Sequence, residues 1–180
     1  VVWIEQQERE QLAVFWRDRL ADRPAVTPLP AGRQLFDGAT TPFACREVER
    51  VLSASGSAAV RELAEREHLT LSSIMQGAWA LALARQSGER DVIFGAVVGG
   101  RPAQLDGADE MIGVFINTVP VRITIDEHEP IGSWLRALQT RQAESEPFQY
   151  GALAEIQRWS GAGAGAPLFD TLLNVANYSV

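Results

Sequence analysis

Apolar side chains recur at helical spacing near the start of the chain. Leu12, Trp16 and Leu20 lie on one side of a helical projection, with charged residues between them, which predicts an amphipathic helix over residues 4–20. The stretch ADRPAVTPLPAG that follows holds three prolines and a glycine. Residues 21–42 are therefore expected to form an extended connector on the surface.

A strand and two helices are predicted next. Apolar and polar residues mix over residues 43–52 in a pattern typical of a strand, and a helix then begins at Ser57 and runs to about Glu67. Thr70 is a favourable N-cap for a second helix, LSSIMQGAWALALARQ, which Gly88 ends. This second helix is apolar nearly all round, so we expect it to be buried on most of its sides against a sheet.

Two apolar runs around a glycine-rich connector form the centre of the chain. The run VIFGAVV at residues 92–98 is continuous, which fits a central strand covered on both faces. In the second run, residues 119–125, apolar and polar positions alternate, and Pro120 puts part of this half-buried strand at a sheet edge or a bulge. The connector between the runs holds turn-forming residues, namely Gly99, Gly100, Pro102 and Gly107.

The last third of the chain predicts a helix, a loop and a strand. Pro130 opens a helix whose apolar residues, from Ile131 to Leu138, form one stripe. GAGAGA at residues 161–166 is typical of a flexible loop, and LFDTLLNVANY of a last strand. The order of these elements predicts an α/β fold, a two-layer sandwich in which helices cover one face of a mixed sheet.

Composition and charge narrow the classes of function. The chain has 180 residues, which favours one domain, and a net charge of −7, with arginine as its only basic residue other than histidine. An acidic chain without a basic run is a poor binder of nucleic acid or of an anionic membrane. No apolar run is long enough to span a bilayer and the first residues have no signal-peptide core, so a cytoplasmic location is expected.

Few side chains of this sequence fit a catalytic motif. His68 falls at a predicted helix end and His128 in an acidic turn, and neither belongs to a metal-binding or catalytic pattern, so both are expected at the surface. Cys45, the single cysteine, is expected to be a buried strand thiol. The sequence has no GxSxG elbow and no P-loop, and no motif in it indicates a catalytic group.

Three polar residues near the central runs remain candidates for a specific role. Arg101 starts the connector, and Arg122 in the second run is expected to be solvated or paired with a carboxylate. Asn117 interrupts an apolar run, so its amide, if buried, must find partners. Those partners are either backbone groups or an amide of a substrate.

Five segments together resemble the C-terminal half of a nonribosomal peptide synthetase condensation domain. These are, in order, VVWIEQQEREQLAVFWRDRL, DVIFGAVVGGRP, EMIGVFINTVPVR, PFQYGALAEIQRWS and GAPLFDTLLNVANY. The resemblance covers nearly the whole chain. The combination IGxFxNTxPxR followed by PLFD is the most specific part of it.

The resemblance implies one lobe of a chloramphenicol acetyltransferase-like fold. In that fold two α/β lobes enclose a tunnel, and carrier proteins insert phosphopantetheine arms from either mouth. The acceptor amine then attacks the donor thioester and an amide forms. The family's HHxxxDG motif lies on the other lobe and is absent here, so residues 1–180 are expected to be the C-terminal subdomain, inactive alone, with a crossover or latch at about residues 99–116.

The resemblance also assigns residues to the tunnel and to the latch. Asn117 and Thr118 match the NT of the family motif and Arg122 its arginine, and Arg101, Thr118 and Arg122 are expected to be structural. The family commonly has serine where Gly99 stands, and often VFENY where this chain has NVANY. The expected substrate-binding residues are Asn117, Gly99, Asn174 and Ala176.

The implied partners are the N-terminal lobe, the upstream and downstream carrier proteins and neighbouring synthetase domains. No cofactor is expected on this chain itself, since phosphopantetheine comes with the carriers. Both ends of the chain are abrupt, as expected of a fragment. Two alternatives remain open: an epimerization-domain or standalone acyltransferase relative, and a half-domain that docks carriers without turnover.

Overall fold

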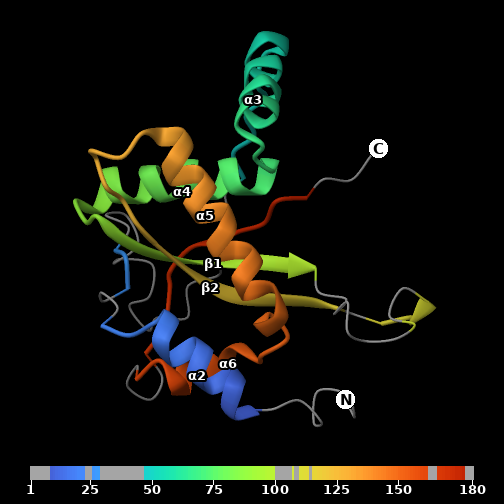
Figure 1. The fold of residues 1–180 in the computed structure, drawn as a ribbon, viewed down its shortest axis with the longest axis vertical. Coiled ribbons are helices and arrows are strands. Elements are labelled where there is room, and N and C mark those ends of the chain that lie inside the picture. Colours follow the sequence, from blue (N-terminus) through green and yellow to red (C-terminus); the bar gives the residue numbers. More distant parts are fainter. Residues whose placement is uncertain are drawn as a thin grey trace.

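The three-dimensional structure is a computed structural model, and a mixed sheet lies at its centre (Figure 1). It describes residues 9–22, 26–28, 47–99, 107, 110–113, 115–161 and 166–176. Cys45, Arg101 and most of the expected latch lie outside the described residues, as do the first residues of the predicted N-terminal helix.

The sheet has three strands in the order β2-β1-β3. β1, Asp91–Gly99, is the central strand and pairs antiparallel with β2, Ile116–Thr124, and parallel with the short β3, Leu172–Leu173. The prediction of a central strand is confirmed. Pro120 lies in β2 at an edge of this sheet, as predicted, because an edge strand can spare one backbone donor.

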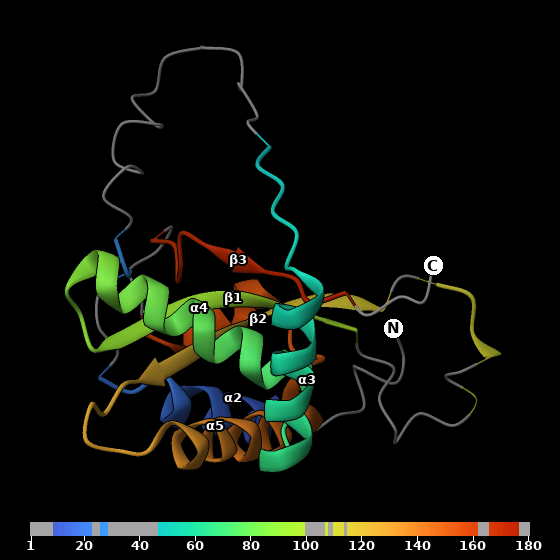
Figure 2. The same cartoon turned by 90° about the horizontal axis from the view of Figure 1, so that it is seen from above.

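Three helices cover one face of the sheet. They are α3, Ala54–Glu67, α4, Leu71–Ser87, and α5, Ile131–Ser145. Their core cluster includes Phe94 of β1 and Leu135 of α5, both buried. Figure 2 shows α4 over the sheet, while α5 runs past it on the side of β2.

The second face is also covered. Helices α2, Arg9–Arg19, and α6, Leu153–Trp159, lie below the sheet in Figure 1, and the 3₁₀ helix η3, Glu146–Phe148, leads from α5 to α6. Trp16 and Ile156 form a separate core cluster there with Ile93 of β1. Successive β1 side chains therefore enter opposite cores, which is why the run 92–98 is apolar without alternation.

Local sequence sets the ends of the helices. Ser53 caps α3 by accepting a hydrogen bond from Gly56 N at 3.1 Å, and Thr70 Oγ1 accepts from Ser73 N at the same distance. Each cap satisfies a backbone donor that the first helical turn leaves free. Gly88 ends α4 with φ 78°, a left-handed conformation that costs glycine little. The predicted cap and end of α4 are confirmed, and α3 begins three residues earlier than expected.

Several expectations are corrected. The α/β class and the mixed sheet are confirmed, but helices cover both faces rather than one. The predicted strand over residues 43–52 is wrong for residues 47–52, which form no strand, because no described strand lies beside them. The last strand has two residues, and Ile131 is exposed because it lies in the first turn of α5.

Helix α4 is less buried than its composition predicts. Ser73, Ala80 and Leu83 are buried, but Leu71 and Leu81 are exposed. The buried positions face the sheet and α5, and the described residues provide no third layer over the opposite side of the helix. An apolar circumference therefore indicates what a helix could cover, and only the packing decides which sides are covered.

Candidate functional site

A cavity of about 300 Å³ lies where β1 and β2 pass α4, α5 and the end of α2. Gly99 stands at its β1 end and Val175, after β3, forms part of its wall. The strands supply mostly aliphatic side chains, and the helices supply amides, hydroxyls and guanidinium groups. The polar lining residues from the helices and the turn after α5 are Arg19, Ser72, Gln76, Arg141, Gln142, Ser145 and Gln149.

A chain of hydrogen bonds joins α4 to α5 at the wall of this cavity. Ser73 Oγ lies 3.0 Å from Gln142 Oε1 and 3.1 Å from Gln139 Oε1, and the amides of Gln142 and Gln76 meet at 2.8 Å. Because a hydroxyl has one proton, Ser73 donates to only one of these oxygens. Every bond is satisfied when the Gln142 and Gln76 amides turn over together, so that Gln142 Nε2 donates to Ser73 and Ser72 Oγ donates to Gln76.

The far end of this chain is fixed by backbone groups. Gln139 Oε1 accepts from Thr70 N at 2.7 Å, and Gln139 Nε2 donates to His68 O at 3.0 Å. The amide of Gln139 therefore has one orientation, while those of Gln76 and Gln142 can present either a donor or an acceptor at the cavity. A wall with this property suits a ligand that carries amide groups.

Asn117 holds the turn that closes one side of the cavity. Its Nδ2 donates to Gln149 O at 2.6 Å and to Gly151 O at 2.8 Å, and its Oδ1 accepts from Thr118 N at 2.9 Å. Both donors of the amide are used by backbone carbonyls. Of the two alternatives raised by the sequence, the structure has the backbone partners, and Asn117 acts on the cavity through the position of Gln149.

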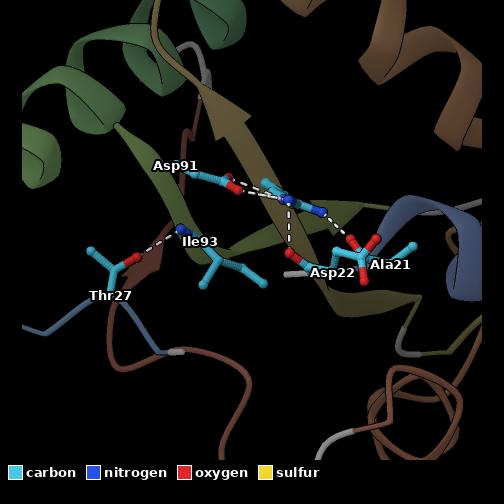
Figure 3. Close-up of polar contacts among 6 residues, drawn as sticks. Ala21, Asp22, Thr27, Asp91 and Ile93 are labelled. Carbon is cyan, nitrogen blue, oxygen red and sulfur yellow. Dashed lines mark hydrogen bonds and ion pairs between the residues drawn. The ribbon is translucent and has the colours of Figure 1, made fainter. Parts of the chain in front are cut away.

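Arg122 joins both strands to the end of α2. Its Nε lies 3.0 Å from each carboxylate oxygen of Asp91 and its Nη2 donates to Asp91 Oδ2 at 2.6 Å, while Nη1 donates to Ala21 O at 2.5 Å (Figure 3). The hydrogen bond with Asp91 raises the pKa of Arg122 above its usual value. Arg122 thus pairs with a carboxylate, one of the two arrangements expected from the sequence.

Replacing Arg122 by lysine tests this contact. An ammonium group cannot reproduce the planar set of bonds to Asp91 and Ala21, so we expect a loss of about 1–2 kcal/mol in the free energy of unfolding. The control is Arg90→Lys, in a pair with Glu127 whose side chains are 67% and 62% exposed, which should cost less than about 0.5 kcal/mol. Equal losses in urea unfolding would contradict a special role for Arg122.

A hydroxyl completes the hydrogen bonding of β1 on the side away from β2. Thr27, which is buried, accepts a hydrogen bond from Ile93 N at 2.8 Å, and Gly95 N donates to Thr171 O at the same distance (Figure 3). The short β3 pairs only with Gly95 and Ala96, so Thr27 satisfies a donor that a longer strand would have reached.

Two further guanidinium groups face the cavity. Arg19 donates to Arg141 O at 2.6 Å and lies 3.6 Å from Glu144 Oε2. Burial, and then the charge of Arg141, lower the pKa of Arg19 from its usual value. Carboxylates beside Arg19 and Arg122 offset much of the positive charge, so the cavity is polar rather than a strongly cationic site.

The remaining predicted site residues lie at the rim or outside it. Gly99 is exposed, and a Cβ placed on it would meet no atom within 4 Å. Asn174 and Ala176 are exposed on either side of Val175, which lines the cavity. Thr118 is half-buried in β2 and pairs with Val97. The structure therefore brings Gly99, Arg122 and the segment 174–176 to one cavity.

The described part of the chain has no group with the features of a catalytic acid or base. His68 and His128 are exposed, as predicted, and lie in the turns after α3 and before α5. Within the described ranges no three or more metal-binding side chains gather to hold an ion. None of the described helices is long and apolar enough to cross a membrane.

The sequence reasoning missed the amide wall. Ser72 and Gln76 are polar interruptions four residues apart in the otherwise apolar α4, and Gln142 and Gln149 lie seven apart near the end of α5. The first spacing puts two side chains on one helix face and could have drawn attention to them. Only the packing of α5 against α4 shows that Gln142 meets Gln76.

Comparisons with known proteins identify the family. The sequence profile of the family described as Condensation domain matches residues 1–180. The chain is 41% identical to a linear gramicidin synthase of Brevibacillus parabrevis over all of its length and 4% of that protein's, and 41% identical to chondramide synthase cmdD of Chondromyces crocatus over 99% of this chain and 4% of that protein.

A solved structure shares the fold. The first condensation domain of the CDA synthetase superposes with a TM-score of 0.72 at 20% identity, over 94% of this chain and 35% of that chain. The chain thus spans about 4% of the length of the two curated relatives and about a third of this solved domain. With the profile match over its full length, the chain belongs to the condensation-domain family.

Proposed function

We propose that this chain is the C-terminal lobe of a nonribosomal peptide synthetase condensation domain and forms one wall of its amide-forming site. The observation that carries this proposal is the cavity at the ends of β1 and β2, whose polar wall is built of carboxamides and hydroxyls. The family match over residues 1–180 supports it, as does the 35% share of the solved condensation domain that the chain covers.

The proposed reaction joins two carrier-bound groups. The amine nitrogen of the acceptor attacks the carbonyl carbon of the donor thioester, the new C–N bond forms, the C–S bond breaks, and the donor carrier's thiol leaves while the amine loses its proton. Positioning of two tethered reactants supplies a large part of such catalysis, on the order of several kcal/mol. A wall that orients both arms therefore contributes without a titrating group of its own.

Phosphopantetheine arms, brought by the carrier proteins, fit the chemistry of the cavity. Such an arm carries two amide groups, each with a donor and an acceptor. Gln76 and Gln142 can turn to match either, and Ser145 and Gln149 add further polar groups to the wall. A volume of about 300 Å³ is at the lower end for a ligand site, as expected when a second lobe completes it.

The expected latch has the exposed apolar surface that such a role requires. Met111, Ile112 and Ile116 are exposed in the segment that leads into β2, which extends away from the helices in Figures 1 and 2. Isolated apolar side chains on a projecting segment are costly unless a partner covers them. We assign the other lobe of the domain as that partner for about residues 99–116.

The test is amide formation by the complete condensation domain with two loaded carrier proteins, followed by mass spectrometry of the carrier-bound product. A condensation domain yields the elongated thioester on the acceptor carrier. An epimerization relative would instead change the stereochemistry of one carrier-bound residue, and a docking module would bind carriers without any product. Either result would overturn the proposed function.

Gly99→Ser tests the position of the cavity rim. Because the added Cβ meets open space, the variant should keep its melting temperature within about 1 °C while its hydroxyl narrows the cavity. We expect the rate of amide formation to change with a bulky acceptor more than with glycine as acceptor. The control is Gly88→Ser, at φ 78° and remote from the lining residues, which should lower stability and leave acceptor preference unchanged.

A further inference from the structure

The segment before α3 presents aliphatic side chains to solvent. Val48 is 67% exposed, Val51 85% and Leu52 64%, and residues 47–52 have no regular structure. Three large aliphatic side chains within five residues form a concentrated apolar surface, unlike the single exposed side chains that are normal on any protein. In Figure 2 this segment is an extended trace that leads into α3 with no strand alongside it.

The same residues have the sequence of a strand. Val48 and Leu52 share one side of an extended chain, and Val51 lies on the other, with charged residues between them. β-branched residues favour strands because they pack well on a pleated surface. Sequence and structure therefore disagree here in a specific way: the segment has strand propensity, and the described chain offers it no neighbouring strand.

The end of the segment is already fixed in an extended conformation. Ser53 has φ −61° and ψ 160°, its hydroxyl caps α3 through Gly56 N at 3.1 Å, and its carbonyl accepts from Ser57 N at 2.9 Å. This cap ties the segment to a helix of the main body. The segment thus leaves the body in the conformation that a strand requires, and little further ordering would be needed for pairing.

We propose that residues 47–52 form a β-strand in the complete domain and that the part of the condensation domain outside this chain covers Val48, Val51 and Leu52. This inference rests on the proposed function, because it takes the chain as one lobe. Solved domains of this fold are about three times as long as the aligned part, with 35% to 37% of their chains covered, so the remaining two-thirds is large enough to supply both a strand edge and an apolar surface.

Hydrogen exchange of the complete domain provides the first test. The amides of residues 47–52 should exchange at least about tenfold more slowly than an unstructured peptide, with the buried amides of β1 as an internal reference for the folded state. In the 180-residue chain itself, the same amides should exchange fast while β1 stays protected. Fast exchange in the complete domain would overturn the proposal, and so would protection in the 180-residue chain, since its own residues would then cover the segment.

A charged substitution provides the second test. Val51→Asp in the complete domain should lower the melting temperature by at least about 3 °C, because the carboxylate would be buried at the interface. The matched control is Val14→Asp on α2, where the valine is 43% exposed and lies outside the segment, with a shift below about 1 °C. Equal shifts for both variants would overturn the proposal.

Two readouts separate this inference from the proposed function. Protection of residues 47–52 with no amide product would leave the strand in place and remove the reaction. Amide formation with an unprotected segment would do the reverse. Protection that is lost on dilution would show that a second copy of the domain covers the segment, and would overturn the assignment to the same domain.

Discussion

Replacing Trp16 by alanine is expected to destabilise the fold by about 3–5 kcal/mol, as large-to-small changes of buried aromatic residues do. Trp16 is 1% exposed, belongs to the core cluster on the α2 face of the sheet and lines the cavity. Its Nε1 donates to Phe148 O at 3.2 Å, and its ring meets Phe15 edge to face at 5.2 Å between centroids. Alanine would remove this packing and leave a void that the rigid strands cannot fill.

The measurement is urea unfolding, with the slope of the transition compared between variants. Trp16→Phe keeps an aromatic ring but loses the hydrogen bond to Phe148, so a smaller loss is expected. Val14→Ala, on the same helix and 43% exposed, should cost less than about 0.5 kcal/mol. A loss below about 1.5 kcal/mol for Trp16→Ala would mean that α2 is not part of the cooperative core.

Asn117→Asp is expected to cost about 2–4 kcal/mol at neutral pH, although the two side chains have nearly the same shape. Aspartate would place an oxygen where Nδ2 now donates to Gln149 O and Gly151 O. Two donors would be lost and a negative charge would face two carbonyl oxygens. The turn after η3 should then move away from β2 and widen the cavity on the side of Gln149.

The pH dependence of this variant has a definite sign. Because the folded state disfavours the carboxylate, the pKa of Asp at position 117 should be higher in the folded than in the unfolded state. Stability should therefore be greatest below the unfolded pKa and fall as the pH rises through the folded pKa. Urea unfolding at several pH values measures this trend.

Asn117→Ala is the matched control, since it loses the same bonds without adding a charge. It should cost about 1–2 kcal/mol with no such dependence on pH, and it should slow amide formation by the complete domain. If Asn117→Asp were as stable as the parent chain at neutral pH, the two carbonyl contacts would not be what holds the turn. An unchanged rate of amide formation in Asn117→Ala would remove Asn117 from the site.

The chemistry of the cavity follows from which polar groups remain adjustable. Gln139 is fixed by backbone groups at Thr70 and His68, and Asn117 is fixed by Gln149 and Gly151. Gln76 and Gln142 are bonded mainly to side chains, so they can exchange donor for acceptor together. A ligand with amide groups would therefore find a wall that is rigid in position and adaptable in polarity.

The sequence alone determined the elements whose signals are local. A cap such as Thr70, a left-handed terminator such as Gly88 and a continuous apolar run such as residues 92–98 act within a few positions, so the pattern predicts them directly. The same holds for Pro120, which has no backbone donor and so indicated a sheet edge. The ordered motifs around Asn117 and Arg122 likewise indicated the family.

Only the tertiary structure decided the features that depend on distant neighbours. The amide of Asn117 could have bonded a substrate or the backbone, and the approach of residues 149–151 selected the backbone. The pairing of Gln142 with Gln76 requires α5 to cross α4. Residues 47–52 carry strand propensity without a strand, because pairing needs an edge that another part of the domain must supply.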